Sequence, residues 1–159
     1  MGRKTWESIP PRFRPLKDRV NVLISRQKKG YSKVSIEQGK EVYYEAESLG
    51  ASIEGLESYQ STGDGQYTIE KIFIIGGGQI YKAALRLTGV KRILFTRILD
   101  DFKCDTFFPL NLRDDGQGEQ GWSRMEKEDL DRWVGENIPV GEQLEGERGT
   151  RYIFEMWER

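Results

Sequence analysis

The strongest constraint on the fold is an apolar run that stops at three consecutive glycines and continues as a helical pattern. Residues 71–75 are Lys-Ile-Phe-Ile-Ile, glycines occupy 76–78, and residues 79–87 carry apolar side chains at helical spacing. β-Branched residues bounded by glycine predict a buried strand at 71–75, and the spacing predicts a helix at 79–87. A strand, a tight turn and a helix in succession are typical of α/β folds.

Similar patterns divide the rest of the chain. Further helices are expected at 2–8 and around Leu49, Ile53 and Leu56, and strands at 19–25, near Val34 and Ile36, at 90–98, around Met125 and at 152–157. Polar or glycine-rich loops are expected at 59–66 and 113–121, and a long acidic loop at 133–150. This order predicts one α/β domain over residues 1–159. Its central sheet would be mostly parallel, with flanking helices and an antiparallel C-terminal edge.

Composition excludes several classes of site. The chain has no histidine and one cysteine, Cys104, which rules out a Ser-His-Asp triad, a Cys-His pair and a zinc site, so no metal is expected. Lys and Arg total 25 against 26 Asp and Glu, for a net charge of -1, which favours a small ligand over nucleic acid or a membrane. The lone cysteine fits a reducing compartment such as the cytosol. No apolar run reaches the ~18 residues that a spanning helix needs.

The glycine segment is a candidate phosphate site. Backbone amides between a strand and a helix can bind anionic oxygens. The GxGxxG fingerprint is not met, because Tyr81 occupies the position of the third glycine. A tight connection with no ligand is an alternative interpretation of the same residues.

Two other segments carry donors suited to phosphate. Gly2-Arg3-Lys4-Thr5 places two cations and a hydroxyl at the start of an expected helix, although a solvated basic helix end would have the same sequence. Ser25 and Arg26 follow an expected strand, at the sheet edge where α/β proteins bind ligands. Several such segments in one chain favour a ligand with several phosphates, such as a dinucleotide.

Together these motifs resemble the dihydrofolate reductases, especially the eukaryotic type. The shared motifs are MGRKTWESIP, RPL with a following arginine, the strand ending in Ser25-Arg26, IFIIGGGQIY, LFTRI, DTFFP and RYIFEMWER, in that order. The resemblance spans the chain and implies hydride transfer from NADPH to the pterin ring of dihydrofolate, giving tetrahydrofolate, with protonation of the adjacent ring nitrogen.

The resemblance also implies roles for particular residues. Cofactor contacts would come from Gly2, Arg3, Lys4, Thr5, Ile24, Ser25, Arg26, Gly76, Gly77, Gly78, Gln79, Ile80 and Tyr81, with Arg3 and Arg26 near the 2′-phosphate and a cis peptide at Gly76-Gly77. Substrate contacts would come from Ser8, Ile9, Leu16, Arg19, Ile75 and Tyr81, with Arg19 on the glutamate tail and the Ile75 carbonyl facing the pterin. Considered alone, the apolar members would be ordinary core residues and Arg19 a surface cation.

The chain also departs from the family pattern. Glu47 stands where many relatives carry a neutral or basic residue near the 2′-phosphate. The family's first strand, mobile loop and helix with the pterin-binding Asp or Glu precede the position of Met1, so Thr96, which resembles the threonine bonded to that carboxylate, would lack its partner. No downstream acidic residue has a comparable setting, because Glu7 is on the short helix and Asp100, Asp101 and Asp105 fall at strand ends and loops. We therefore expect a chain starting here to fold poorly alone and to be impaired in turnover.

Two alternatives stay open at this point. The chain could be a non-catalytic NADP-binding remnant, or it could resemble the reductase domain of riboflavin biosynthesis, although TWESIP and DTFFP favour the folate enzyme. The resemblance implies a monomer that binds dihydrofolate and antifolates, in the cytoplasm or also in mitochondria, without nucleic acid or membrane partners.

Overall fold

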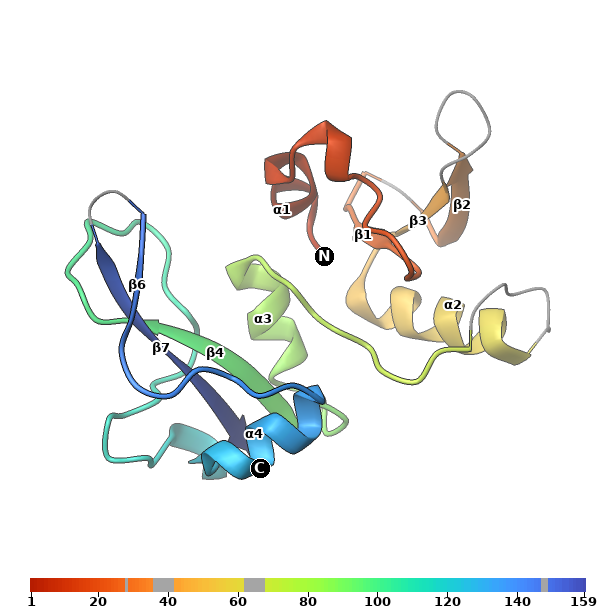
Figure 1. Cartoon of the computed structure of the whole chain (residues 1–159). Coiled ribbons are helices and arrows are strands. Elements are labelled where there is room, and N and C mark those ends of the chain that lie inside the picture. Colours follow the sequence, from red (N-terminus) through yellow and green to blue (C-terminus); the bar gives the residue numbers. More distant parts are fainter. Residues whose placement is uncertain (28, 36–41, 62–67, 147–148) are drawn as a thin grey trace. The chain divides into compact units, whose positions relative to one another are not determined.

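The computed structural model describes residues 1–27, 29–35, 42–61, 68–146 and 149–159. These residues form two compact units, Met1–Leu87 and Thr88–Arg159 (Figure 1). Within the described ranges, no helix combines the length and apolar character needed to cross a membrane.

The first unit contains a three-stranded sheet in the order β1-β3-β2. Strands β1 (Val22–Ile24) and β3 (Val42–Ala46) are parallel, and β2 (Tyr31–Ser35) is antiparallel to β3. Gly2 makes an isolated parallel bridge to Ile24. The chain start therefore lies along β1.

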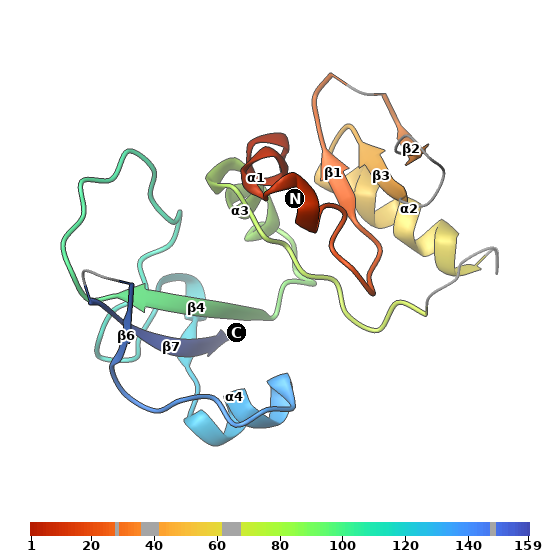
Figure 2. The same ribbon diagram turned by 45° about the horizontal axis from the view of Figure 1, so that its top comes forward.

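Three α-helices accompany this sheet: α1 (Arg3–Ser8), α2 (Leu49–Ser61) and α3 (Gly78–Ala84), with a short 3-10 turn η1 at Pro11–Phe13. Helix α2 contacts all three strands and runs along the sheet (Figure 2). Its first turn is capped by Ser48, whose Oγ accepts a hydrogen bond from the Ala51 N–H at 3.1 Å. Trp6, Leu23, Ala46 and Leu56 are buried in this unit.

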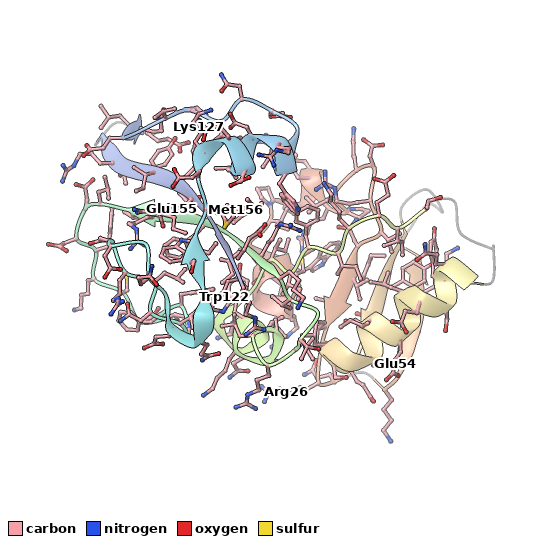
Figure 3. The ribbon with its side chains drawn as sticks, turned by 90° about the horizontal axis from the view of Figure 1, so that it is seen from below. Arg26, Glu54, Trp122, Lys127, Glu155 and Met156 are labelled. Atoms are coloured by element: carbon pink, nitrogen blue, oxygen red, sulfur yellow. The ribbon has the colours of Figure 1, made fainter. Side chains whose placement is uncertain are left out.

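The second unit is built on an antiparallel sheet. Strand β7 (Thr150–Glu158) pairs with β4 (Arg92–Ile98), β5 (Ser123–Arg124) and β6 (Gln143–Glu145). Helix α4 (Lys127–Val134) packs on β7, and a 3-10 turn η2 spans Glu119–Gly121. Trp122, Met156 and Trp157 are its most deeply buried side chains, and Figure 3 labels the first two. Large apolar groups on β7 and at the end of η2 thus supply its core.

Several expected elements are confirmed. The helices at 2–8, 79–87 and around Leu49–Leu56 correspond to α1, α3 and α2, and the strands at 19–25, 90–98 and 152–157 correspond to β1, β4 and β7. The antiparallel C-terminal edge is confirmed by the pairing of β4 with β7. The strand near Val34 is β2, while Ile36 and residues 62–66 lie outside the described residues.

The strand expected at 71–75 is wrong for the described chain, which has no strand between α2 and α3. Ile72 and Phe73 are 52% and 58% exposed. β-Branched composition gives a propensity only, and a strand forms when a neighbour also supplies the ladder of hydrogen bonds. The expectation of a mostly parallel sheet is also wrong for the described strands. Among them, β1 and β3 are the one parallel pair.

Other differences concern loops. Strand β3 was not expected, because Val42–Ala46 mixes aromatic and acidic residues without clear alternation. Helix α2 extends through Tyr59–Ser61, where a loop was expected. The acidic stretch 133–150 contains the end of α4 and strand β6, whose pairing partner β7 lies further along the chain. The strands β3 and β6 form because neighbouring strands pair with them, which local composition does not predict.

Candidate active site

Main-chain hydrogen bonds bring the three expected cofactor segments together in the first unit. The Gly2 N–H donates to the Gly76 carbonyl at 2.8 Å, and the Ile24 N–H donates to the Met1 carbonyl at 2.7 Å. The segments at 2–5, 24–26 and 76–81 are thus neighbours around the start of the chain. Sequence spacing alone did not require this arrangement.

The glycine segment is closely packed, and Gly76 has a backbone conformation that favours glycine. Gly76 has a φ of +93°, and an added Cβ would lie 3.2 Å from the Tyr81 ring. A Cβ on Gly77 would lie 3.7 Å from the Thr5 Oγ1. The peptide between the two glycines is cis, which confirms the expectation at that position. Burial raises the pKa of the Tyr81 phenol.

Helices α1 and α3 begin beside one another. Their N-cap residues are Gly2 and Gly77, and neither forms a side-chain cap within the described chain. The Gly77 carbonyl accepts hydrogen bonds from the Ile80 and Tyr81 N–H groups at 2.8 and 3.0 Å. First-turn N–H groups without an internal partner can donate to anionic oxygens. Close backbone packing and adjacent donors therefore fit a phosphate-bearing cofactor.

Cations lie at the same segments. Arg3, Lys4 and Arg26 are exposed. The Arg3 Nη1 lies 3.4 Å from the Glu7 Oε1, an exposed pair on one face of α1. The Ser25 Oγ accepts a hydrogen bond from the Gln27 N–H at 3.4 Å. Exposed guanidinium and ammonium groups keep donors available for phosphate.

The expected substrate residues Ser8, Ile9, Leu16, Arg19 and Ile75 also belong to the first unit. The Asn21 side chain fixes the Leu16 backbone, accepting from its N–H at 3.0 Å and donating to its carbonyl at 2.8 Å. The Arg19 Nε donates to the Lys17 carbonyl at 2.8 Å. Ile75 is 38% exposed. The Asn21 side chain thereby closes the Leu16–Asn21 turn.

Thr96 belongs to the second unit, on β4. It lines a hollow of about 420 Å³ formed by β4, β7 and the β6–β7 hairpin, with Ile98, Glu145, Gly146, Thr150, Tyr152 and Phe154. Glu145 was not named from the sequence as a neighbour of Thr96, and it lines the same hollow. Glu145 comes near Thr96 because β6 pairs with β7, with Glu145 opposite Thr150.

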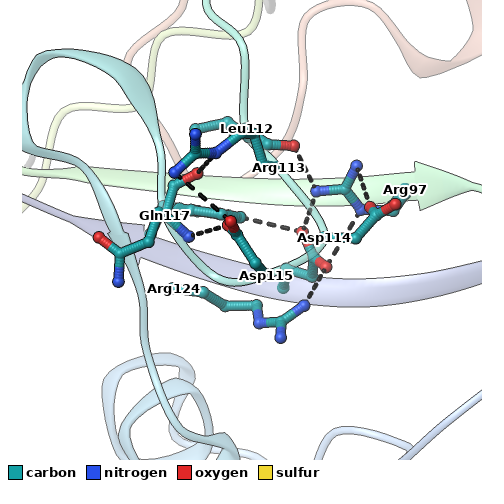
Figure 4. Close-up of polar contacts among 9 residues, drawn as sticks. Arg97, Leu112, Arg113, Asp114, Asp115, Gln117 and Arg124 are labelled. Atoms are coloured by element: carbon teal, nitrogen blue, oxygen red, sulfur yellow. Dashed lines mark hydrogen bonds and ion pairs between the residues drawn. The ribbon is translucent and has the colours of Figure 1, made fainter.

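A charged network covers the opposite face of β4. The Arg97 guanidinium makes two hydrogen bonds to the Glu155 carboxylate, at 3.1 and 3.0 Å, and donates to the Leu112 carbonyl at 2.8 Å (Figure 4). The Arg124 Nη1 and Trp157 Nε1 donate to the same carboxylate at 3.2 and 2.9 Å. Strand side chains alternate between faces, so this network holds β4 from the side away from Thr96.

Burial and hydrogen bonding oppose each other at Glu155. Burial alone would raise the pKa of its carboxyl, but hydrogen bonds from Arg97, Trp157 and Arg124 outweigh burial, and the pKa is lowered. The carboxylate therefore stays ionised, and the network is structural in the described unit.

Comparisons with known proteins all point to one family. The family model for dihydrofolate reductase matches residues 1–132. The dihydrofolate reductase of Pneumocystis carinii is 43% identical over 160 residues, covering 100% of this chain and 72% of that protein. The Cryptococcus neoformans enzyme is 36% identical, covering 99% of this chain and 72% of that protein.

Animal relatives and a solved structure agree. The Bos taurus dihydrofolate reductase is 34% identical over 159 residues, covering 100% of this chain and 71% of that protein. Schistosoma mansoni dihydrofolate reductase superposes with a TM-score of 0.68 at 30% identity, covering 99% of this chain and 72% of that one. This agreement confirms the expected α/β fold type. The chain therefore belongs to the dihydrofolate reductase family, a family of oxidoreductases.

Proposed function

We propose that this protein catalyses the NADPH-dependent reduction of dihydrofolate to tetrahydrofolate. The observation that carries the proposal is the convergence of the segments at 2–5, 24–26 and 76–81, joined by the Gly2–Gly76 and Ile24–Met1 hydrogen bonds. Family membership supplies the reaction class. NADPH, when bound, supplies the hydride that reduces the pterin.

The chain's own residues would bind and orient the cofactor. Arg3, Lys4, Thr5 and the amides of Gly77 and Gly78 would hold its phosphates, and Arg26 with Ser25 the 2′-phosphate side of the adenosine. Gln79, Ile80 and Tyr81 would continue the contact along α3. The absence of side chains at 76–78 would let the backbone approach the ligand closely.

On the substrate side, Arg19 would pair with the carboxylates of the glutamate tail, because a guanidinium suits a carboxylate in a bidentate geometry. Ser8, Ile9 and Leu16 would line the pterin and benzoyl groups, and the Ile75 carbonyl would accept from the pterin edge. Thr96 would support the pterin-binding carboxylate of the family wherever that carboxylate is present. These contacts orient the ring for transfer.

A second candidate is cofactor binding without turnover. It is favoured by one observation: in the described part of the chain, no carboxylate hydrogen-bonds to the Thr96 hydroxyl, although Glu145 lines the same hollow. Reduction of the pterin also needs a proton, so a site without a positioned acid would bind and fail to turn over.

Further assignments follow from the same proposal. The chain would act as a single reductase domain over residues 1–159 and as a monomer, binding dihydrofolate and antifolates, with neither nucleic acid nor membrane as a partner. It would act in the cytoplasm, and mitochondria would be a further compartment. Chromatography with light scattering would test the monomer.

The deciding experiment measures binding and turnover on one preparation. NADPH is titrated against the chain by calorimetry, and dihydrofolate is then added while NADPH absorbance is followed. Binding followed by dihydrofolate-dependent oxidation supports the reductase. Saturable binding without oxidation supports the second candidate. A chain that binds no NADPH, or that oxidises it only with a riboflavin precursor, contradicts the proposal.

A further inference from the structure

Arg26 and Glu47 are brought to the same edge of the first sheet. Strands β1 and β3 are parallel and their last residues, Ile24 and Ala46, are directly opposite in register. The Ser25 N–H donates to the Ala46 carbonyl at 2.9 Å, so the segments that follow β1 and β3 leave the sheet side by side. The carboxyl ends of parallel strands are where α/β proteins bind nucleotides.

The turn that carries Arg26 is fastened to Glu47. The Glu47 Oε2 accepts a hydrogen bond from the Gly30 N–H at 3.0 Å, and the Glu47 N–H donates to the Gly30 carbonyl at 3.0 Å. Strand β2 begins at Tyr31, opposite Ala46, so Gly30 also lies at this edge. The Glu47 carboxylate therefore lies at the same sheet edge as Arg26, where the Gly30 N–H holds it.

The two charges act in opposite directions on a nucleotide bound at this edge. A guanidinium attracts the dianionic 2′-phosphate of NADPH, whereas a carboxylate repels it. The same carboxylate can accept a hydrogen bond from the free 2′-hydroxyl of NADH, which is the usual role of an acidic residue at the end of such a strand.

We infer that Glu47 is a specificity-determining residue that weakens the preference of this protein for NADPH over NADH. The inference rests on the proposed cofactor site. Glu47 is exposed, so the carboxylate acts through solvent and its effect is limited in size. It lowers the affinity for NADPH severalfold and leaves NADH binding intact.

The test compares Glu47→Gln with the unmodified chain by calorimetric titration of NADPH and NADH. Glutamine keeps an oxygen that accepts from the Gly30 N–H, so the turn is retained and only the charge is lost. Glu57→Gln is the matched control, because Glu57 is also exposed and lies about 12 Å further along α2 from Leu49 at helical rise. A thermal melt of each variant checks that the fold is kept.

The expected result is an NADPH dissociation constant about fivefold lower in Glu47→Gln, with that for NADH within about twofold of the unmodified chain. The NADPH gain should shrink at about 1 M salt, where the Debye length is about 3 Å. Glu57→Gln should leave both constants unchanged.

An unchanged ratio of the two constants in Glu47→Gln, or an equal change in Glu57→Gln, overturns the inference while the cofactor site stands. An unmodified chain that binds neither nucleotide removes the proposed cofactor site, and the inference with it. A gain for NADPH that does not depend on salt also overturns the inference, because it would indicate a structural effect.

Discussion

The main-chain N–H of Gly2 donates to the carbonyl oxygen of Gly76 at 2.8 Å. This bond ties the start of α1 to the turn before α3, and the Gly2–Ile24 bridge ties the same point to β1. One residue thus connects all three segments of the proposed cofactor site, so a change at the glycine turn should affect binding through α1 as well.

Replacing Gly76 by alanine tests the close packing of that turn. The new Cβ would require an L-residue at a φ of +93° and would lie 3.2 Å from the Tyr81 ring. We expect a loss of about 1–3 kcal/mol of stability and at least a tenfold weaker NADPH affinity. Urea unfolding and calorimetry measure the two. Gly89→Ala is the control, because nothing lies within 4 Å of its added Cβ, and it should change neither.

Arg26→Gln tests the 2′-phosphate assignment. Arg26 is exposed and follows Ser25 at the end of β1. Loss of a charge-assisted contact should weaken NADPH binding about tenfold, with little change for NADH. Arg86→Gln, at an exposed arginine beyond α3, should leave NADPH affinity unaltered. Equal weakening of both nucleotides by Arg26→Gln would speak against the assignment.

Arg19→Gln tests the contact with the glutamate tail. The Arg19 Nε is held by the Lys17 carbonyl, which leaves the terminal nitrogens for a ligand. Dihydrofolate should bind about tenfold more weakly, whereas dihydropteroate, which has no glutamate, should bind as before. Fluorescence titration of the two ligands distinguishes the outcomes, and equal losses would place the arginine elsewhere than at the tail.

Glu155→Gln tests the charged network under β4. The side chain of Glu155 is 3% exposed and accepts hydrogen bonds from Arg97, Arg124 and Trp157. Removing its charge leaves the two guanidinium groups without their shared partner. Because Arg124 is 37% exposed and Arg97 keeps the Asp114 carboxylate at 3.1 Å, urea unfolding near neutral pH should show a loss of about 1–3 kcal/mol.

The same carboxyl predicts a pH dependence. Its pKa in the folded chain is below the ordinary value, so its stabilising contribution is present above the unfolded pKa of about 4.3 and is lost as pH falls through the folded pKa. Stability measured from neutral pH to pH about 2 should fall below pH about 4, and less steeply in Glu155→Gln. Identical slopes in both proteins would show that other carboxyls carry the acid sensitivity.

Local sequence patterns predicted α1, α2 and α3, whereas α4 was not expected. The apolar spacing of Leu49, Ile53 and Leu56 predicted α2, in which Leu56 is buried. Gly76–Gly78 also indicated both the turn and the start of α3. These features depend on neighbours within a few residues, so the sequence alone is sufficient.

Features that depend on distant partners were less predictable. Residues 71–75 have the composition of a strand and are not one in the described chain, and β3 is a strand without the pattern of one. Glu145 reaches the hollow of Thr96 only because β6 pairs with β7. Which residues share a sheet face is decided by pairing across the chain, and composition does not encode it locally.

The convergence of the cofactor segments is tested most directly by hydrogen exchange of the full chain with and without NADPH. Protection should increase at residues 2–5, 24–26 and 76–81, which the Gly2–Gly76 bond and the Gly2–Ile24 bridge hold together. Exchange within β4 and β7 serves as the internal comparison. Added protection in those three segments supports the account, and no protection anywhere, or protection confined to β4 and β7, would contradict it.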